Sequence, residues 1–288
     1  MVTLRHKKVS VVVPNYNYGK YLKKRIDSIL RQTYPIYELI ILDDASTDGS
    51  MEIINQIISE VRNKFPNLKV KLFCDEKNSG KAIIQWEKAF ELATGDYVWI
   101  AEADDLSNRK FLEKVMDGFN DPDVVLSYTE SEIINSAGLM ILPSFRRSRD
   151  REKTGHYAND YIKEGRREVE EIMAIRCTIP NVSAVVFKKN AIPYWRYLKE
   201  AERFLQVGDW YFYIKVLGHG RISYKRDALN KFRVHNRSKT SSSKKDKGHY
   251  REIVEMHKII MASFNIDESV AKRMIAEEKR IAKRMNIN

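Results

Sequence analysis

The sequence contains little cysteine and no long apolar segment. Cys74 and Cys177 are the only cysteines among 288 residues, too few for a disulfide framework, and they fit a reducing compartment. Near the N-terminus, basic residues precede an apolar run over 9–13 that is too short for the apolar region of a signal peptide. No other run approaches the length of a membrane span. We therefore expect a cytoplasmic protein.

Glycine-rich phosphate-binding loops are also absent. The sequence contains neither G-x-G-x-x-G nor G-x-x-x-x-G-K-[ST], so a bound nucleotide would need a metal ion and basic side chains around its phosphates. Basic residues are plentiful, because 51 Lys and Arg against 39 Asp and Glu give a net charge of +12. Such an excess favours anionic partners, which include nucleotides, nucleic acid and an anionic membrane face. The 43% hydrophobic content is ample for one large domain, or for one domain with an appendage.

Apolar runs of strand length alternate with helical periodicity through the first half of the chain. We expect strands over 9–13 (ended by Pro14), 37–42, 68–73, 97–101 and 124–128. We expect helices over 21–32, 53–61, 82–93 and 110–119. This alternation predicts an α/β fold with a mostly parallel sheet, helices on both faces and right-handed crossovers.

The second half is less regular. We expect helices over 161–175, 250–264 and 269–285, and strands over 182–187, 221–224 and 229–234. The aromatic segment 209–217 fits either a helix or a strand, and a basic loop is expected over 146–153.

Acidic residues directly follow two of the expected strands. Asp43 and Asp44 follow one strand, and Glu102, Asp104 and Asp105 follow another, in the segment DYVWIAEADD. Both clusters should emerge at the carboxyl edge of the sheet, where ligands bind in open α/β folds. Crowded carboxylates at the end of a buried strand need neutralising, and Mg²⁺ or Mn²⁺ prefers such oxygen ligands. The structural alternative is that each cluster forms a turn and caps the helix that follows.

Four spaced segments resemble the inverting glycosyltransferases of family 2. They are VSVVVPNYNYGKYL, SILRQTYPIYELIILDDASTDGS, NSG and ATGDYVWIAEADD, and the resemblance is close over 9–130 and looser to residue 240. It implies the GT-A fold, with a nucleotide-sugar-binding half over 1–130, an acceptor-binding and catalytic half over 131–245, and a C-terminal helical extension over 246–288. The implied partners are a nucleotide-sugar donor and the glycan or lipid-linked acceptor of a bacterial surface polysaccharide, without nucleic acid.

The resemblance assigns the donor contacts residue by residue. Pro14 and Tyr16 would line the base and ribose. Asp44 would accept a hydrogen bond from a pyrimidine ring N–H, which leaves UDP- and dTDP-sugars open as donors. The loop that would approach the base holds Asn78, Gly80 and Lys81.

The same resemblance implies a divalent cation, Mn²⁺ or Mg²⁺. Asp104 would face the ribose or the metal, and Asp105 the metal. Glu102 stands where the family more often has Asp, which puts its direct contact in doubt. A later motif, Phe-Arg-Val-His over 232–235 with Ser238 after it, would bring Arg233 and His235 to the metal and diphosphate, with Arg237 as a further cation. For His235 the alternative is a solvated loop residue.

Asp209 stands where the family carries its catalytic base, with Gly208 in place of the first member of the usual acidic pair. It would take the proton of the acceptor hydroxyl during a single displacement with inversion. The alternative is that Asp209 only caps an aromatic helix.

Other functions and partners stay open at this point. A sugar-nucleotide nucleotidyltransferase would need a glycine-rich, arginine-bearing first loop, and a nucleic-acid-binding domain would need exposed aromatic residues among the basic ones. The last segment combines an apolar stripe (Val270, Met274, Ile275, Ile281 and Met285) with many Lys and Arg residues. That pattern fits a helix at the inner membrane face, a helix packed on the catalytic domain, a homodimer contact, or a contact within a larger multidomain enzyme.

Overall fold

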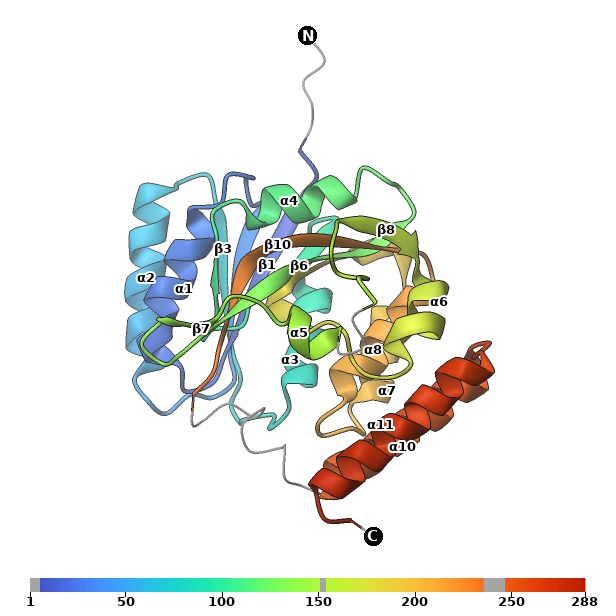
Figure 1. Ribbon diagram of the computed structural model, residues 1–288. Coiled ribbons are helices and arrows are strands. Elements are labelled where there is room, and N and C mark those ends of the chain that lie inside the picture. Colours follow the sequence, from blue (N-terminus) through green and yellow to red (C-terminus); the bar gives the residue numbers. More distant parts are fainter. Residues whose placement is uncertain (1–5, 151–153, 236–246, 288) are drawn as a thin grey trace.

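The computed structural model describes residues 6–150, 154–235 and 247–287 (Figure 1). These residues form one ten-stranded sheet in the order β3-β2-β1-β4-β9-β6-β10-β5, with β7 paired to β6 and β8 paired to β10. The strands are β1 (Val9–Asn15), β2 (Glu38–Asp43), β3 (Lys69–Cys74), β4 (Tyr97–Ile100), β5 (Leu106–Ser107), β6 (Val124–Ile134), β7 (Met140–Leu142), β8 (Tyr161–Glu164), β9 (Val185–Lys188) and β10 (Arg221–Arg233). Strands β3, β2, β1 and β4 are parallel, as are β6 and β10, and β9 joins the two groups antiparallel to both.

Helices cover both faces of this sheet. They are α1 (Gly19–Leu30), α2 (Ser50–Lys64), α3 (Ala82–Leu92), α4 (Phe111–Gly118), α5 (Arg146–Arg149), α6 (Gly165–Glu168), α7 (Tyr194–Ala201), α8 (Gly208–Leu217), α10 (Lys247–Ser263) and α11 (Glu268–Arg284). A π-helical turn spans Val169–Met173, and 3₁₀ turns span Val182–Ala184 and Lys189–Ala191.

The alternation of side chains along β1 explains the two layers of helices. Val11 and Val13 pack in one buried cluster with α1, α2 and α4, whereas Val12 packs in the other cluster with α3, α7 and α8. Successive strand residues point to opposite faces, so an unbroken apolar strand needs cover on both sides. The predicted α/β fold with helices on both faces is confirmed.

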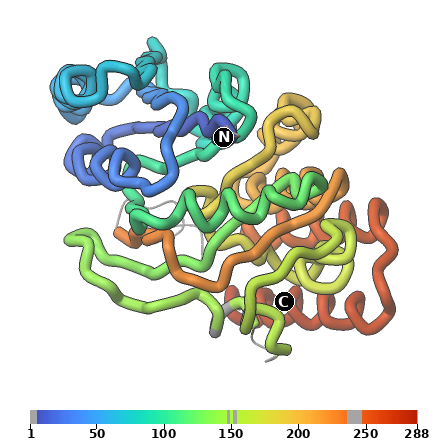
Figure 2. The backbone as a smooth tube through the Cα atoms, turned by 90° about the horizontal axis from the view of Figure 1, so that it is seen from above, coloured from blue at the N-terminus to red at the C-terminus, as the bar shows by residue number. Residues whose placement is uncertain are grey.

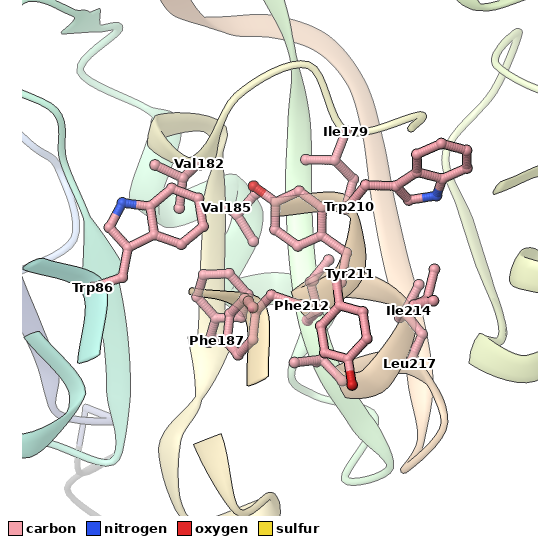
Figure 3. Close-up of a cluster of buried hydrophobic side chains, with 14 of the residues drawn as sticks. Trp86, Ile179, Val182, Val185, Phe187, Trp210, Tyr211, Phe212, Ile214 and Leu217 are labelled. Carbon is pink, nitrogen blue, oxygen red and sulfur yellow. The ribbon is translucent and has the colours of Figure 1, made fainter. Parts of the chain in front are cut away.

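The segment 209–217, which the sequence left as helix or strand, is the core helix α8. Its aromatic side chains meet Trp86 of α3 and the apolar residues Val182, Val185 and Phe187 (Figure 3). Eight of its ten residues are buried, which explains why no single apolar stripe stood out in the sequence.

The C-terminal helices α10 and α11 pack on the rest of the protein, on the opposite side of the molecule from α1 and α2 (Figures 1 and 2). Ile253, Met256 and Ile260 of α10 and Val270 and Met274 of α11 are buried in the larger core cluster. Most of the apolar stripe therefore faces the protein. Within the described ranges, no helix is long and apolar enough to cross a membrane.

Several element predictions are wrong for identifiable reasons. The segment 161–175 begins as strand β8, because Tyr161–Glu164 pairs with β10, and the following Gly165 lies so close to other backbone that an added Cβ would sit 2.2 Å from the Leu217 carbonyl oxygen. The two short strands expected over 221–234 form one strand, β10, whose register against β6 shifts between Lys225 and Asn230. The basic loop contains the short helix α5.

Strand β1 also continues through Pro14, where an end was expected. Its pairing with β4 ends at Val12, so at Pro14 it is paired only with β2. Proline lacks an N–H and is tolerated where one side of a strand is unpaired.

Candidate active site

A cleft of about 310 Å³ lies at the carboxyl ends of the parallel strands, and we refer to it as the carboxyl-edge cleft. Residues from the ends of β1, β2, β4 and β10 and from the loop after β3 line it. Eight residues expected from the sequence are among them: Pro14, Tyr16, Asp44, Asn78, Lys81, Asp104, Asp105 and Arg233. The two acidic clusters therefore meet at one cavity, although the roles of the individual residues stay predictions.

Side-chain hydrogen bonds join the loop after β1 to the loop after β2. Asn15 donates to Asp43 Oδ2 over 2.8 Å and to Ser46 Oγ over 3.0 Å. Asp43 Oδ1 accepts the Ser46 N–H over 2.8 Å, so this buried carboxylate is used within the turn. The linked loops leave Tyr16 43% exposed on the cleft wall. The next acid after Asp43, Asp44, lies in the cleft lining.

Asp44 is held by the loop after β3. Its Oδ1 accepts the Ser79 N–H and its Oδ2 accepts the Ser79 hydroxyl, both over 2.8 Å. Gly80 has a φ of 74° and donates its N–H to Asn78 Oδ1 over 2.6 Å, a left-handed turn that favours glycine. The Lys81 ammonium bonds a backbone carbonyl just after α7, so the loop bridges the two halves of the chain.

The second acidic cluster is tied to the end of β10. Asp104 Oδ2 lies 3.0 Å from His235 Nε2, and Asp105 Oδ1 accepts the backbone N–H of Arg233 over 2.8 Å. His235 lines a neighbouring hollow with Tyr18 and reaches the cleft through Asp104. Burial, reinforced by the charge of Asp104, raises the pKa of Asp105 well above its usual range.

The guanidinium of Arg233 serves mainly to hold this geometry. It donates to the carbonyl of Asp104 over 2.5 Å and to the carbonyls of Asn135 and Ser136 over 2.8 and 3.2 Å. It also lies 4.5 Å from the ring centroid of Tyr21.

Glu102 differs from its two neighbours. Its Oε1 accepts the indole N–H of Trp86 over 3.0 Å, and its backbone N–H donates to Ser183 Oγ over 3.1 Å. A second cation, Arg25 of α1, is fully buried near the cluster and donates to Ser107 Oγ over 2.7 Å. Burial lowers the pKa of Arg25 to about 10, and the carboxylates of the cluster act in the opposite direction.

The donor set at the cleft fits a hard divalent cation shared with a substrate. Asp104, Asp105 and His235 provide carboxylate oxygens and an imidazole. Among the described residues, however, no group of three His, Cys, Asp or Glu side chains could hold a metal ion alone. Mg²⁺ sites commonly use one or two protein carboxylates together with substrate phosphates. The burial of Asp105 beside the carboxylate of Asp104 fits such an ion.

Asp209 lies in the first turn of α8 and lines a second cavity, of about 400 Å³, which we refer to as the Asp209 cavity. Its Oδ1 accepts the N–H of the next residue, Trp210, over 2.7 Å, whereas the N-cap of α8 is Val207, so Asp209 does not cap the helix. Phe232 lines both the Asp209 cavity and the carboxyl-edge cleft, so the two adjoin there. Burial raises the pKa of Asp209 to about 6, and the nearby charge of Glu252 acts in the same direction. A carboxylate of this kind is ionised at neutral pH and can accept a proton.

Several residues of the site were missed from the sequence. Ser79 belongs to the NSG segment, so its position in that loop could have indicated that it lies at the site. Arg25 carried no signal, because a charged residue on a helix is usually solvent-exposed. Asn181 lines the cleft, and its Oδ1 accepts a hydrogen bond from the Asn230 side chain over 2.9 Å. The two residues are far apart in sequence, so local patterns could not indicate this contact. Arg237 and Ser238 lie outside the described residues.

Known proteins share both the sequence pattern and the fold. The family model described as glycosyl transferase family 2 matches residues 10–175. The putative teichuronic acid biosynthesis glycosyltransferase TuaG of Bacillus subtilis is 33% identical over 132 residues, which are 45% of this chain and 49% of TuaG. The poly(ribitol-phosphate) beta-N-acetylglucosaminyltransferase TarS of Staphylococcus aureus is 36% identical over 108 residues, 37% of this chain and 18% of TarS. The match thus spans less than two thirds of either relative.

Two solved structures are similar over nearly the whole chain. TarS 1–349 of S. aureus in complex with UDP-GlcNAc has a TM-score of 0.65 at 20% identity, covering 96% of this chain and 72% of that one. The mannosyltransferase PcManGT of Pyrobaculum calidifontis, in complex with GDP-Man and Mn²⁺, has a TM-score of 0.62 at 20% identity, covering 96% and 70%. The fold is therefore GT-A, as expected. With a family match over more than half of its length, the chain belongs to glycosyltransferase family 2.

Proposed function

We propose that this chain transfers a sugar from a nucleoside-diphosphate donor to an acceptor hydroxyl, with inversion at the anomeric carbon and with Asp209 as the general base. The observation that carries the proposal is the carboxyl-edge cleft, in which both acidic clusters and the loop after β3 line one cavity beside Asp209. The sugar nucleotides bound by TarS and PcManGT support the same class of donor.

The donor nucleotide would lie between Tyr16 and the loop after β3. Each oxygen of Asp44 already accepts one hydrogen bond from Ser79. A carboxylate oxygen has two lone pairs, so Asp44 keeps capacity to accept the ring N–H of uracil or thymine. A UDP- or dTDP-sugar is therefore the proposed donor, with Asn78 and Lys81 along the base and Pro14 along the ribose.

Asp104 and Asp105, with His235, would hold Mn²⁺ or Mg²⁺. The bound cation supplies positive charge to the departing diphosphate, and the Mn²⁺ complex of PcManGT supports this choice. The Arg233 guanidinium ties the Asp104 carbonyl to those of Asn135 and Ser136, and the Arg233 backbone N–H holds the Asp105 carboxylate.

The proposed reaction is a single displacement. The acceptor oxygen forms a bond to the anomeric carbon as the bond to the diphosphate breaks, and the acceptor proton moves to a carboxylate oxygen of Asp209. Since its pKa is raised only to about 6, Asp209 is ionised at neutral pH and is still basic enough to accept the proton.

The test is Asp209→Asn, with Asp267→Asn as its control. Asp267 caps α11 and accepts the Ser269 N–H over 2.8 Å. Both variants therefore replace a carboxylate that accepts a backbone N–H at the start of a helix by an amide. We expect Asp209→Asn to lose about 10²- to 10⁴-fold in transfer rate while UDP with Mn²⁺ still raises its melting temperature. The Asp267 variant should transfer normally. Near-normal transfer by Asp209→Asn would remove Asp209 from the role of base.

The biological setting rests on the relatives. TuaG and TarS are named for teichuronic acid and poly(ribitol-phosphate), which supports a role in building a bacterial surface polysaccharide or glycolipid. From the resemblance to family 2 glycosyltransferases, we also propose a division into a donor half (1–130), an acceptor half (131–245) and a helical extension (246–288). A place at the inner membrane face, a homodimer and a larger multidomain enzyme stay proposals. Binding to anionic vesicles and the mass in solution would test the first two.

A further inference from the structure

A stretch without charged residues contains the turn between β6 and β7, and we refer to residues 133–145 as the apolar hairpin. This stretch has no Asp, Glu, Lys or Arg, although 31% of the chain is charged. Its four consecutive large aliphatic residues are 49–67% exposed: Leu139, Met140, Ile141 and Leu142. Figure 2 shows the hairpin, in light green, at the outer edge of the molecule. Large apolar side chains that gather on a surface in this way mark an interaction site.

Hydrogen bonds hold the apolar hairpin in one shape. In its turn, Asn135 Oδ1 accepts the N–H groups of Ala137 and Leu139, each over 3.0 Å. The Arg233 guanidinium donates to the carbonyls of Asn135 and Ser136 over 2.8 and 3.2 Å. A segment that is already ordered loses little conformational entropy when it binds a partner. The exposed side chains are therefore presented by a pre-formed element.

Both faces of β7 are apolar and exposed. Met140 and Leu142 point to one face and Ile141 to the other, because successive side chains of a strand alternate. Among the described strands, β7 pairs only with β6. A second protein chain packed on β7 would cover one face, whereas the headgroup boundary of a lipid bilayer surrounds an inserted hairpin on both faces. Two-sided exposure therefore favours a lipid surface, entered only to the depth at which water still reaches the backbone.

Positive charge accompanies the apolar hairpin. Arg146, Arg147 and Arg149 follow it directly in the sequence. Arg146 and Arg149 both pair with the buried carboxylate of Glu130, which balances only part of their charge. Beside the turn of the hairpin, the exposed Lys20 lines the same hollow as the turn residues. Cations next to an apolar tip are complementary to a bilayer with anionic headgroups.

The apolar hairpin adjoins the carboxyl-edge cleft. Its turn lines a hollow together with Tyr18 and His235, and Tyr18 also lines the cleft. Arg233 connects the turn to the acidic cluster, because it also donates to the Asp104 carbonyl. A surface that held the hairpin would therefore lie beside the cleft.

We propose that the apolar hairpin inserts into the headgroup boundary of an anionic lipid bilayer and thereby holds the carboxyl-edge cleft at the membrane surface. Residues 139–142 enter the boundary, and the neighbouring cations stay among the headgroups. The inference deepens the proposed function and rests on it for the use of the cleft, but docking itself needs neither donor nor acceptor. Helix α11 has no part in this docking, because Val270 and Met274 of its apolar stripe are buried.

Vesicle flotation measures the docking without any transfer reaction. The native protein is mixed with vesicles of phosphatidylglycerol and phosphatidylcholine in equal parts, and separately with vesicles of phosphatidylcholine alone. We expect binding to the mixed vesicles, and binding at least about 10-fold weaker to the neutral ones. Added salt should weaken the binding to the mixed vesicles. No binding to the mixed vesicles, or equal binding to both kinds, would overturn the inference.

The variants are Met140→Ser and Ile141→Ser, on the two faces of β7, with Ile275→Ser as the matched control. Ile275 lies in α11 and is 51% exposed, against 53% for Ile141. We expect each hairpin variant to weaken vesicle binding about 10-fold and Ile275→Ser to leave it unchanged. All three should keep the native melting temperature, because the replaced side chains are exposed. An effect of only one hairpin variant would indicate a one-sided contact with a protein, such as a second copy of this chain, and would overturn the inference. An effect of Ile275→Ser alone would assign docking to α11 and would also overturn it.

The Asp209→Asn protein separates this inference from the proposed function. It should bind the mixed vesicles as the native protein does, because the apolar hairpin is intact. If Asp209→Asn retains transfer while the hairpin variants lose vesicle binding, the base is wrong and the docking surface stands. If Asp209→Asn loses transfer while the native protein does not bind vesicles, the docking surface is wrong and the base stands.

Discussion

The carboxylate of Glu252, in α10, is the acceptor for three consecutive backbone N–H groups at the start of α8. Its two oxygens accept the N–H groups of Leu205, Gln206 and Val207 over 2.8, 2.9 and 3.2 Å. The chain then enters α8 at Gly208, one residue before Asp209. Replacing Glu252 by Ala removes all three hydrogen bonds, so we expect it to loosen the segment that leads to the proposed base.

The size of the effect follows from these contacts. A hydrogen bond to a charged group contributes about 1.5–3 kcal/mol, with partial compensation by water where the site is half-exposed. We therefore expect a loss of about 2–3 kcal/mol in the free energy of unfolding for Glu252→Ala. At about 2–4 °C per kcal/mol for a chain of this size, its melting temperature should fall by about 5–10 °C.

The matched control is Glu255→Ala on the same helix. Glu255 lies 3.1 Å from Arg203, with side chains 50% and 55% exposed, and an ion pair of this kind is worth about 0–1 kcal/mol. Thermal denaturation, UDP binding and transfer rate are measured for both variants. Glu252→Ala should lose stability and transfer rate but keep UDP binding, whereas Glu255→Ala should change little. Equal melting temperatures for the two variants would refute the reasoning.

Three further predictions follow from other parts of the molecule. The pKa of Asp209 is raised to about 6, so the transfer rate should rise with pH to about 6 and level off above it, because the base acts when ionised. The Asp209 carboxyl contributes stability at a pH below its unfolded pKa, and this contribution is lost as the pH rises through about 6. In thermal denaturation at pH 7, Asp209→Asn should therefore be at least as stable as the native protein. Arg25→Met removes the buried cation beside the acidic cluster and should lower the free energy of unfolding by about 3 kcal/mol. Mn²⁺ should raise the melting temperature of this variant more than that of the native protein. An equal Mn²⁺ effect on both proteins would contradict the electrostatic role of Arg25. In Gly165→Ala, the added Cβ would lie 2.2 Å and 2.3 Å from the carbonyl oxygens of Leu217 and Gly220, and urea denaturation should show a loss of about 1–3 kcal/mol.

The local chemistry of the sequence was sufficient for the first half of the fold. Apolar runs of strand length, helical periodicity and turn residues are properties of neighbouring residues, and they predict the alternation from β1 to β6 apart from the two-residue strand β5. Because these strands are parallel, their carboxyl ends lie at the same edge of the sheet. For this reason the meeting of Asp44 with Asp104 and Asp105 at one cleft could be predicted without coordinates.

Tertiary structure decided what depends on contacts between distant segments. Strand β8 exists because β10 pairs with it, although residues 161–164 alone resemble the start of a helix. Arg25 is buried near the acidic cluster because α1 packs against the strand that carries Trp99, 5.1 Å from its guanidinium. The apolar stripe of α11 could equally have met a membrane or another subunit. In the structure, Val270 and Met274 of this helix are buried in the core. This packing fixes the rotation of α11 about its axis and so places Arg284 in the lining of the Asp209 cavity.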